Sequence, residues 1–263
     1  MENQMDYRHL IPPCKEIARA AGVAILGVYR SLDFGIQTKS DDSPVTLADQ
    51  AANQIIQERL APLLGGIPIL SEEGDIAPYE VRQQWQRYWL VDPLDGTREF
   101  INRNDQFSIN IALIENGQPV LGILFAPALD MMAYATHEGA YVEMNGQPAQ
   151  QLVTTAEDRE EIRVVCSRSY IHRKTRDYIN TLSEPKVIPV GSALKFLWLA
   201  LEWAEVYPRY GTTMEWDTAA PQIILEAAGG QVVDIETNER LLYNKAQLEN
   251  PDFLAVRHKS MIS

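Results

Sequence analysis

The sequence predicts a layered protein in which an α+β amino-terminal part is followed by an α/β carboxy-terminal part. Three observations carry this prediction. Two helical patterns open the chain at 13–30 and 47–60, short apolar runs separated by tight turns fill 106–144, and strand and helix patterns alternate after about residue 152. Consecutive strands with tight turns favour antiparallel pairing, whereas alternating strands and helices favour α/β layers.

The two amino-terminal helices are predicted from apolar residues that recur every three or four positions. The pattern holds over residues 13–30 and again over residues 47–60. Thr46 directly precedes the second pattern and is the expected N-cap. Asp49 lies three residues further on and can reach back to complete a short capping box.

The strands are predicted from short apolar runs. Residues 67–71 and 88–92 are two such runs, and each leads into acidic residues. Turns at Asn116-Gly117 and around Glu138-Gly139 predict two successive hairpins. The remaining predicted elements are strands at 163–167, 186–190, 205–207, 232–234 and 252–257 and helices at 174–182, 193–201 and 218–228.

Composition excludes several classes of protein. The chain has 263 residues, with 36 Asp and Glu against 23 Lys and Arg, so its net charge is −13. Such a chain is poorly suited to bind extended nucleic acid or an anionic membrane surface. Two cysteines, Cys14 and Cys166, predict neither a disulfide framework nor a cysteine zinc site. No signal peptide is visible in residues 1–15, so a cytoplasmic location without an obligate membrane anchor is expected, with peripheral association at the inner membrane left open.

Four carboxylates lie where predicted strands end or a predicted helix begins. Glu72 follows one apolar run, Asp92 and Asp95 follow the next, and Asp217 immediately precedes the last helix. Taken singly, Asp217 is better explained as a helix N-cap, and the alternative for the Asp92–Asp95 segment is a polar loop in which Asp95 caps a following helix. Taken together, the four offer the oxygen ligands that Mg²⁺ prefers. Two such ions about 4 Å apart can hold an attacking and a leaving oxygen.

The two residues after Asp95 add a second indication. If a helix begins at Gly96 and Thr97, its free backbone N–H groups form an anion site. Metal-binding carboxylates beside a phosphate cradle point to phosphoryl-transfer chemistry.

Four motifs in chain order carry a family resemblance. They are Pro44-Val-Thr-x-Ala-Asp49, Ser71-Glu-Glu73, Asp92-Pro-Leu-Asp-Gly-Thr97 and Trp216-Asp-Thr-Ala-Ala220. The ordered set resembles the inositol monophosphatase superfamily of Mg²⁺-dependent, lithium-sensitive phosphatases, and it extends over nearly the whole chain.

The resemblance implies an αβαβα sandwich of the inositol monophosphatase and fructose-bisphosphatase type. Residues 1–155 would form an α+β subdomain with most metal ligands, and residues 156–263 an α/β subdomain with Asp217 and the nucleotide contacts. It also implies two or more Mg²⁺ ions. The implied ligands are Glu72, Asp92 and the Leu94 carbonyl for one ion, and Asp92, Asp95 and Asp217 for another.

The resemblance further implies the catalytic groups. Gly96 and Thr97 would bind the scissile phosphate through backbone N–H groups. Thr97 would pair with Asp49 to position or deprotonate the attacking water, and Glu72 is a second candidate for orienting it.

Within the superfamily, the chain is most similar to the 3′(2′),5′-bisphosphate nucleotidases. Two stretches carry this likeness, Gly191-Ser192-Ala-Leu-Lys195-Phe196 and Tyr207-Pro-Arg209-Tyr-Gly211. A second phosphate needs extra cationic contacts, and Arg is suited to bidentate phosphate recognition. The implied substrate-binding set is Glu72, Leu94, Asp95, Gly96, Thr97, Ser192, Lys195, Arg209 and Asp217.

The expected activity is hydrolysis of the 3′-phosphate of adenosine 3′,5′-bisphosphate to AMP and phosphate, linked to sulfate assimilation. Two alternatives are kept, an inositol or sugar phosphatase on the same scaffold and a non-catalytic nucleotide- or metal-binding regulator. Two departures from the family pattern stand out. Pro221 follows the Trp-Asp motif, where it is expected in the first helical turn, and the spacing before His172 is unusual. No oligomeric state is predicted.

Overall fold

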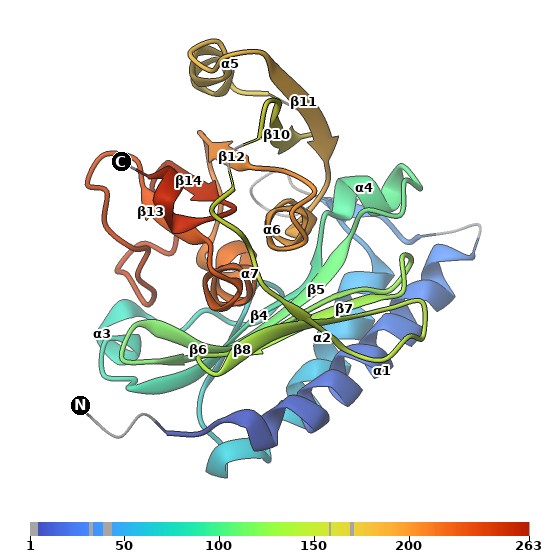
Figure 1. The fold of residues 1–263 in the computed structure, drawn as a ribbon. Coiled ribbons are helices and arrows are strands. Elements are labelled where there is room, and N and C mark those ends of the chain that lie inside the picture. Colours follow the sequence, from blue (N-terminus) through green and yellow to red (C-terminus); the bar gives the residue numbers. More distant parts are fainter. Residues whose placement is uncertain (1–4, 32–33, 39–43, 158, 169–170, 263) are drawn as a thin grey trace.

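Helical layers and β-sheets alternate through the structure, a computed structural model that describes residues 5–31, 34–38, 44–157, 159–168 and 171–262. Helices α1 and α2 cover one face of the larger sheet, and α6 and α7 lie on its other face (Figure 1). The smaller sheet packs over α6 and α7, with α5 beyond it (Figure 1). This order of layers is the predicted αβαβα sandwich.

The amino-terminal elements surround the larger sheet. Their bounds are α1 Ile11–Tyr29, β1 Gln37–Thr38, β2 Pro44–Val45, α2 Leu47–Leu60, β3 Ile69–Ser71, α3 Tyr79–Arg82, β4 Arg87–Asp95, α4 Thr97–Ile101, β5 Ser108–Glu115, β6 Gln118–Ala126, β7 Met131–Thr136, β8 Gly139–Met144 and β9 Gln150–Leu152. Over the described residues, this sheet has seven strands in the order β3-β4-β5-β6-β7-β8-β9. Strands β3 and β4 are parallel, and the hairpins from β5 to β8 pair antiparallel as predicted.

The carboxy-terminal elements build the smaller sheet. Their bounds are β10 Ile162–Ser167, α5 Arg173–Ile179, β11 Pro185–Val190, α6 Leu194–Ala200, β12 Val206–Arg209, α7 Glu215–Ala228, β13 Gln231–Asp234 and β14 Phe253–Val256. The described strands are ordered β11-β10-β12-β14-β13. Strand β10 is parallel to both neighbours, as α/β layering predicts, whereas β14 is antiparallel to both of its own.

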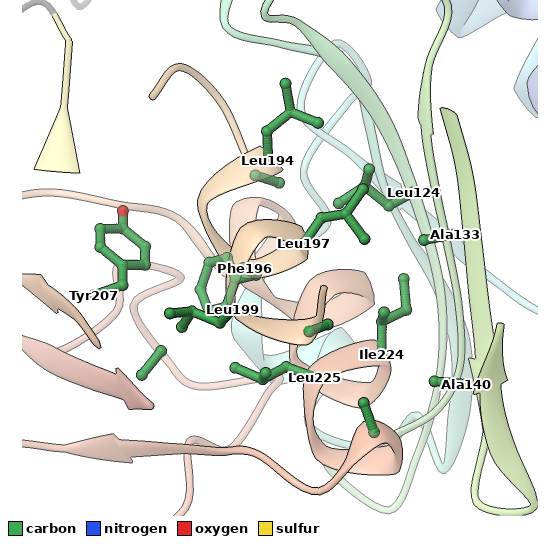
Figure 2. Packing of buried hydrophobic residues seen from close by; sticks show 14 of the residues in the cluster. Leu124, Ala133, Ala140, Leu194, Phe196, Leu197, Leu199, Tyr207, Ile224 and Leu225 are labelled. Carbon is green, nitrogen blue, oxygen red and sulfur yellow. The ribbon is translucent and has the colours of Figure 1, made fainter. Parts of the chain in front are cut away.

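The main core lies between the two sheets. Leucines of α6 and Ile224 and Leu225 of α7 contact small residues on the larger sheet, including Ala133 and Ala140 (Figure 2). Helix α7 approaches the sheet so closely that a Cβ on Gly122 would lie 2.5 Å from the Ala220 carbonyl oxygen. Only glycine fits there, and it brings the beginning of α7 against strands β4 and β5.

A buried polar network fixes the beginning of α7. Glu215 is fully buried, and its carboxylate accepts the backbone N–H groups of Asn244 and Lys245 at 2.7 and 2.9 Å. The Lys245 ammonium also donates to Glu215 at 2.7 Å. Arg82 of α3 holds the same loop through the Asn244 side chain. The loop at residues 242–250 therefore anchors the helix that carries Asp217.

Three sequence-based expectations differ from the structure. Helix α7 begins at Glu215, so Asp217 lies in its first turn and is not the N-cap, which is Met214. Pro221 lies inside α7 and not in its first turn, where it leaves the Asp217 carbonyl without the usual helical donor. Strand β4 runs through both aspartates to Asp95 and does not end at Asp92.

No helix among the described residues is long and apolar enough to cross a membrane.

Candidate metal centre and active-site cavity

A bulge in β4 brings Asp92 and Asp95 to the same face of the larger sheet. In a regular strand, residues three apart point to opposite faces. Here Asp92 pairs with Asn110 of β5 and Asp95 pairs with Ser108, so three steps on β4 match two on β5. The extra residue reverses the alternation. Pro93 lies within the bulge, where its missing N–H removes no ladder hydrogen bond.

Glu72 and Asp217 meet Asp92 at this face from two other elements. Glu72 directly follows β3, and its backbone N–H donates to the Val91 carbonyl at 3.1 Å. Asp217 is held in the first turn of α7, where one oxygen accepts the Met214 N–H at 2.9 Å. One carboxylate oxygen from each of Glu72, Asp92 and Asp217 lies within 4.8 Å of the others. The structure thus joins three of the four predicted carboxylate ligands in one cluster.

Asp95 lies beside this cluster and also contacts the segment just before α6. Its Oδ2 accepts the backbone N–H of Ala193, just before α6. The Leu94 side chain is buried in the core under α1 and α2, while its carbonyl accepts the Thr97 hydroxyl at 3.4 Å. That carbonyl therefore faces the same side as the acidic groups.

The electrostatics of the cluster favour a cation. Burial, together with the charges of Glu72, Asp95 and Asp217, raises the pKa of Asp92 well above its usual range. Burial and the neighbouring carboxylates likewise raise the pKa of Asp217. Burial raises the pKa of Asp95 to about 6, against the opposing effect of Lys195. Like charges held this close out of water are stabilised by a hard divalent ion, which takes oxygen ligands. The donor set therefore fits a metal of this kind.

Asp49 serves both as a helix cap and as a partner of Thr97. Its Oδ2 accepts the backbone N–H of Thr46 at 2.7 Å, which completes the predicted capping box of α2. Its Oδ1 accepts the Thr97 hydroxyl at 3.2 Å. Burial raises the pKa of Asp49 despite these hydrogen bonds. The predicted Asp49–Thr97 pair is therefore present, and its carboxylate is a proton acceptor of increased basicity.

Helix α4 begins at Thr97, as the sequence analysis required for an anion site. Gly96 precedes it with φ of 90°, a left-handed conformation that favours glycine. A Cβ on Gly96 would also lie 3.1 Å from the Gln106 carbonyl and 3.2 Å from the Ser192 Cβ. Glycine at this position thus lets the chain turn from Asp95 into α4 while it lies close to Ser192, just before α6.

Two adjoining hollows that share lining residues contain most of the predicted site residues, and they are named the inner and outer parts of the cavity. The inner part has a volume of about 150 Å³, and the outer part of about 390 Å³. Asp95, Gly96, Arg209 and Asp217 line both parts. Ser192 and Lys195 line the inner part, and Glu72 and Thr97 line the outer part. Asp92, Leu94 and Asp49 are not among the lining residues.

Lys195 is a buried residue of the cavity wall and not a surface lysine on its helix. Only 7% of it is exposed, and its ammonium donates to the Ser192 carbonyl at 2.6 Å. Burial lowers the pKa of Lys195 to about 8 although Asp95 opposes the shift. Arg209 faces the same cavity, with one guanidinium nitrogen on the Thr212 carbonyl at 2.7 Å and a buried Nε that lacks a partner among the described groups. The inner cavity is therefore lined by two cations as well as by the carboxylates Asp95 and Asp217.

Several cavity residues were missed by the sequence analysis. Glu99, Ser167, Thr213 and Phe253 line the inner part. Ser167 ends strand β10, so the signal that identified Glu72 and Asp92 at strand ends could have found it. Thr213 and Phe253 lie in no motif. Phe253 is placed by its ring contacts with Phe196 and Tyr207.

His172 caps a helix and does not line the cavity. Its Nδ1 accepts the backbone N–H of Lys174 at 3.2 Å at the beginning of α5. Residues 169–170, which set the unusual spacing before His172, lie outside the described residues.

A layered fold that holds a carboxylate cluster and a cationic wall in one cavity defines a class of metal-assisted phosphoester-binding proteins. The family model described as the inositol monophosphatase family matches residues 6–261. The chain is 46% identical to the 3′(2′),5′-bisphosphate nucleotidase CysQ of Salmonella typhimurium over 90% of this chain and 96% of that protein. It is 43% identical to the protein of the same name from Escherichia coli K12, again over 90% and 96%.

A solved structure agrees with these relatives. CysQ from Bacteroides thetaiotaomicron, titled a bacterial member of the inositol monophosphatase family, superposes with a TM-score of 0.85 at 35% identity. The superposition covers 96% of this chain and 99% of that one. The chain belongs to the inositol monophosphatase family.

Proposed function

We propose that this protein is a Mg²⁺-dependent 3′(2′),5′-bisphosphate nucleotidase that converts adenosine 3′,5′-bisphosphate to AMP and phosphate. The observation that carries the proposal is the inner cavity, which is lined both by the cations Lys195 and Arg209 and by the carboxylates Asp95 and Asp217. One phosphate can lie at the metal ligands while a second meets these cations. The relatives named as bisphosphate nucleotidases support the same assignment.

The proposed metal ligands are those that the family resemblance implies, and the grouping of oxygens from Glu72, Asp92 and Asp217 supports them. Glu72, Asp92 and the Leu94 carbonyl would hold one ion, and Asp92, Asp95 and Asp217 a second. When bound, such ions lower the pKa of a coordinated water and offset the negative charge of the phosphate.

Thr97 and Asp49 would move the proton of the attacking water. Because the Thr97 hydroxyl donates to Asp49 Oδ1, its own oxygen is free to accept a proton from water. The raised pKa of Asp49 favours its receiving the proton that Thr97 passes on. Glu72 lines the outer cavity and is the second candidate for orienting the water. The backbone N–H groups of Gly96 and Thr97 would hold the scissile phosphate.

A single assay tests the proposed activity. Phosphate release from adenosine 3′,5′-bisphosphate is expected with Mg²⁺, to be lost after chelation with EDTA and to decrease when lithium is added. Inositol 1-phosphate, assayed at the same enzyme concentration, is the matched comparison. Faster release from inositol 1-phosphate would favour the sugar phosphatase. No release from either substrate would favour the non-catalytic regulator.

Arg209→Ala is expected to raise the KM for adenosine 3′,5′-bisphosphate by about tenfold to a hundredfold, since charge-assisted hydrogen bonds contribute about 1.5–3 kcal/mol. The KM for 3′-AMP, which lacks the second phosphate, should change much less. Steady-state kinetics on both substrates give the two values. Equal effects on the two substrates would remove Arg209 from the recognition of the second phosphate.

The link to sulfate assimilation and the location in the cell stay predictions. The division at residue 155 into two subdomains also stays a prediction, although the larger sheet ends at Leu152 and the smaller begins at Ile162.

A further inference from the structure

A buried amide lies next to the carboxylate cluster and has no place in the proposed chemistry. Asn110 of β5 is 1% exposed and pairs directly with Asp92 of β4. Ser108, fully buried, pairs with Asp95 two residues earlier on the same strand. Each aspartate of β4 is thus paired with a buried polar residue of β5, one on either side of the bulge.

These side chains share the face of the sheet that carries the metal site. Directly opposed residues of antiparallel strands point to the same side. Further along β5, Ala112 and Ile114 belong to the cluster that packs against Trp216 and Ala220 of α7. Asn110 lies on that same alternation, so its side chain is on the face of β5 that packs against α7. It is absent from the lining of both parts of the cavity.

The side-chain amide of Asn110 has a hydrogen-bond donor without a partner among the described groups. The Ser108 hydroxyl lies 3.5 Å from the amide oxygen of Asn110, which assigns that end of the amide to Ser108. The amide nitrogen Nδ2 is buried without a hydrogen-bond partner among the described groups. Buried donors in native proteins are nearly always paired. A carboxylate on the adjoining strand is the natural acceptor for this one.

We propose that Asn110 is a positioning residue for the metal centre, whose amide N–H donates to the Asp92 carboxylate when divalent ions are bound. The Leu94 N–H already holds Asp92 Oδ1 at 3.0 Å from one side. A second donor from β5 would fix the plane of the carboxylate, so that both oxygens face the ions. Ser108 would keep the amide in the required orientation. This role rests on the proposed metal site and is tested by binding rather than by turnover.

Asn110→Leu is the most informative variant, because leucine has nearly the shape of asparagine and no polar atom. A purely structural role predicts no change in metal binding. The proposal predicts that Mn²⁺ binding, measured by calorimetry without substrate, weakens by roughly tenfold to a hundredfold, as for other partners of metal ligands. At saturating Mg²⁺ the KM for the nucleotide should change by less than about twofold, because Asn110 does not line the cavity.

Thermal unfolding shows whether weaker Mn²⁺ binding by Asn110→Leu comes from the lost positioning contact or from a destabilised fold. The metal-free Asn110→Leu protein should unfold at the same or a higher temperature than the natural chain, because a buried unpaired donor has been removed. The increase in unfolding temperature on adding Mn²⁺ should be smaller. If leucine prevents folding, Asn110→Ala should show the same loss of Mn²⁺ affinity.

Tyr88→Phe is the matched control. Tyr88 lies on β4, packs in the apolar cluster with Ala112 and Ile114 of β5, and also has a buried polar atom without a partner among the described groups. Its replacement removes that atom at a position four residues before Asp92, paired with Ile114, and should leave Mn²⁺ affinity unchanged. The proposal is overturned if Asn110→Leu binds Mn²⁺ as the natural chain does, or if Tyr88→Phe weakens binding equally. If the natural chain binds Mn²⁺ but shows no phosphatase activity, the proposed function is contradicted and the role of Asn110 is not.

Discussion

Asp92→Asn is expected to lower turnover by about 10⁴-fold, equivalent to about 5.5 kcal/mol of transition-state stabilisation. Asp92 is 1% exposed and is the one ligand assigned to both proposed ions. An amide offers one neutral oxygen in place of two charged ones, so it cannot bridge two hard cations. Steady-state assays across a range of Mg²⁺ concentrations measure the effect, since a weakened site alone would be restored by excess metal.

Asp92→Asn should also fold. In the absence of metal, its free energy of unfolding should be greater than that of the natural chain. Burial and three neighbouring carboxylates raise the pKa of Asp92, so its ionised form destabilises the metal-free fold. Asp75→Asn, which makes the same change at an exposed position after the Glu72-Glu73 turn, is the control and should alter neither property. Near-normal turnover by Asp92→Asn in Mg²⁺ would contradict the bridging role.

Without metal, the protein is expected to lose stability as the pH rises from about 4 to 7. The pKa of Asp95 rises from 3.8 in the unfolded chain to about 6 in the folded protein, and the pKa values of Asp92 and Asp217 are also raised well above the usual value. The folded state therefore binds more protons in this window, and stability decreases as they dissociate. The shift of Asp95 alone corresponds to about 3 kcal/mol.

Denaturant unfolding in EDTA at several pH values measures this decline, and excess Mg²⁺ should remove it because the ions favour the ionised carboxylates. Asp92→Asn and Asp217→Asn should each flatten the curve in EDTA. Carboxylates with lowered pKa values, such as Asp252, act in the opposite direction and only as the pH falls below about 4. If the stability of the metal-free protein rises between pH 4 and 7, the carboxylates Asp92, Asp95 and Asp217 do not destabilise the fold when they ionise.

Much of the fold could be predicted because its signals are local. The capping box of Thr46 and Asp49 and the hairpin turn at Asn116-Gly117 each depend on a few neighbouring residues, and both are present. Glu72 and Asp92 were found for a similar reason, since each follows directly on an apolar strand.

The parts that were wrong or missed depend on contacts between distant segments. The apolar run that predicts a strand ends at residue 92, whereas pairing with β5 carries β4 through the bulge to Asp95. The last predicted helix begins after Asp217, whereas the buried Glu215 and its partners in the loop at 242–250 extend the helix to Glu215. Phe253 reaches the cavity only through the packing of its ring.

The bulge at Pro93 also makes the number of residues between Asp92 and Asp95 a functional requirement. In a regular strand, two ligands for one site must be an even number of residues apart. The odd spacing of Asp92 and Asp95 is functional only because one residue is left out of the pairing. Loss or gain of a single residue between them would turn Asp95 into the core under α1 and α2 while leaving the composition of the motif almost intact. The number of residues in this segment is therefore as strict a requirement as their identity.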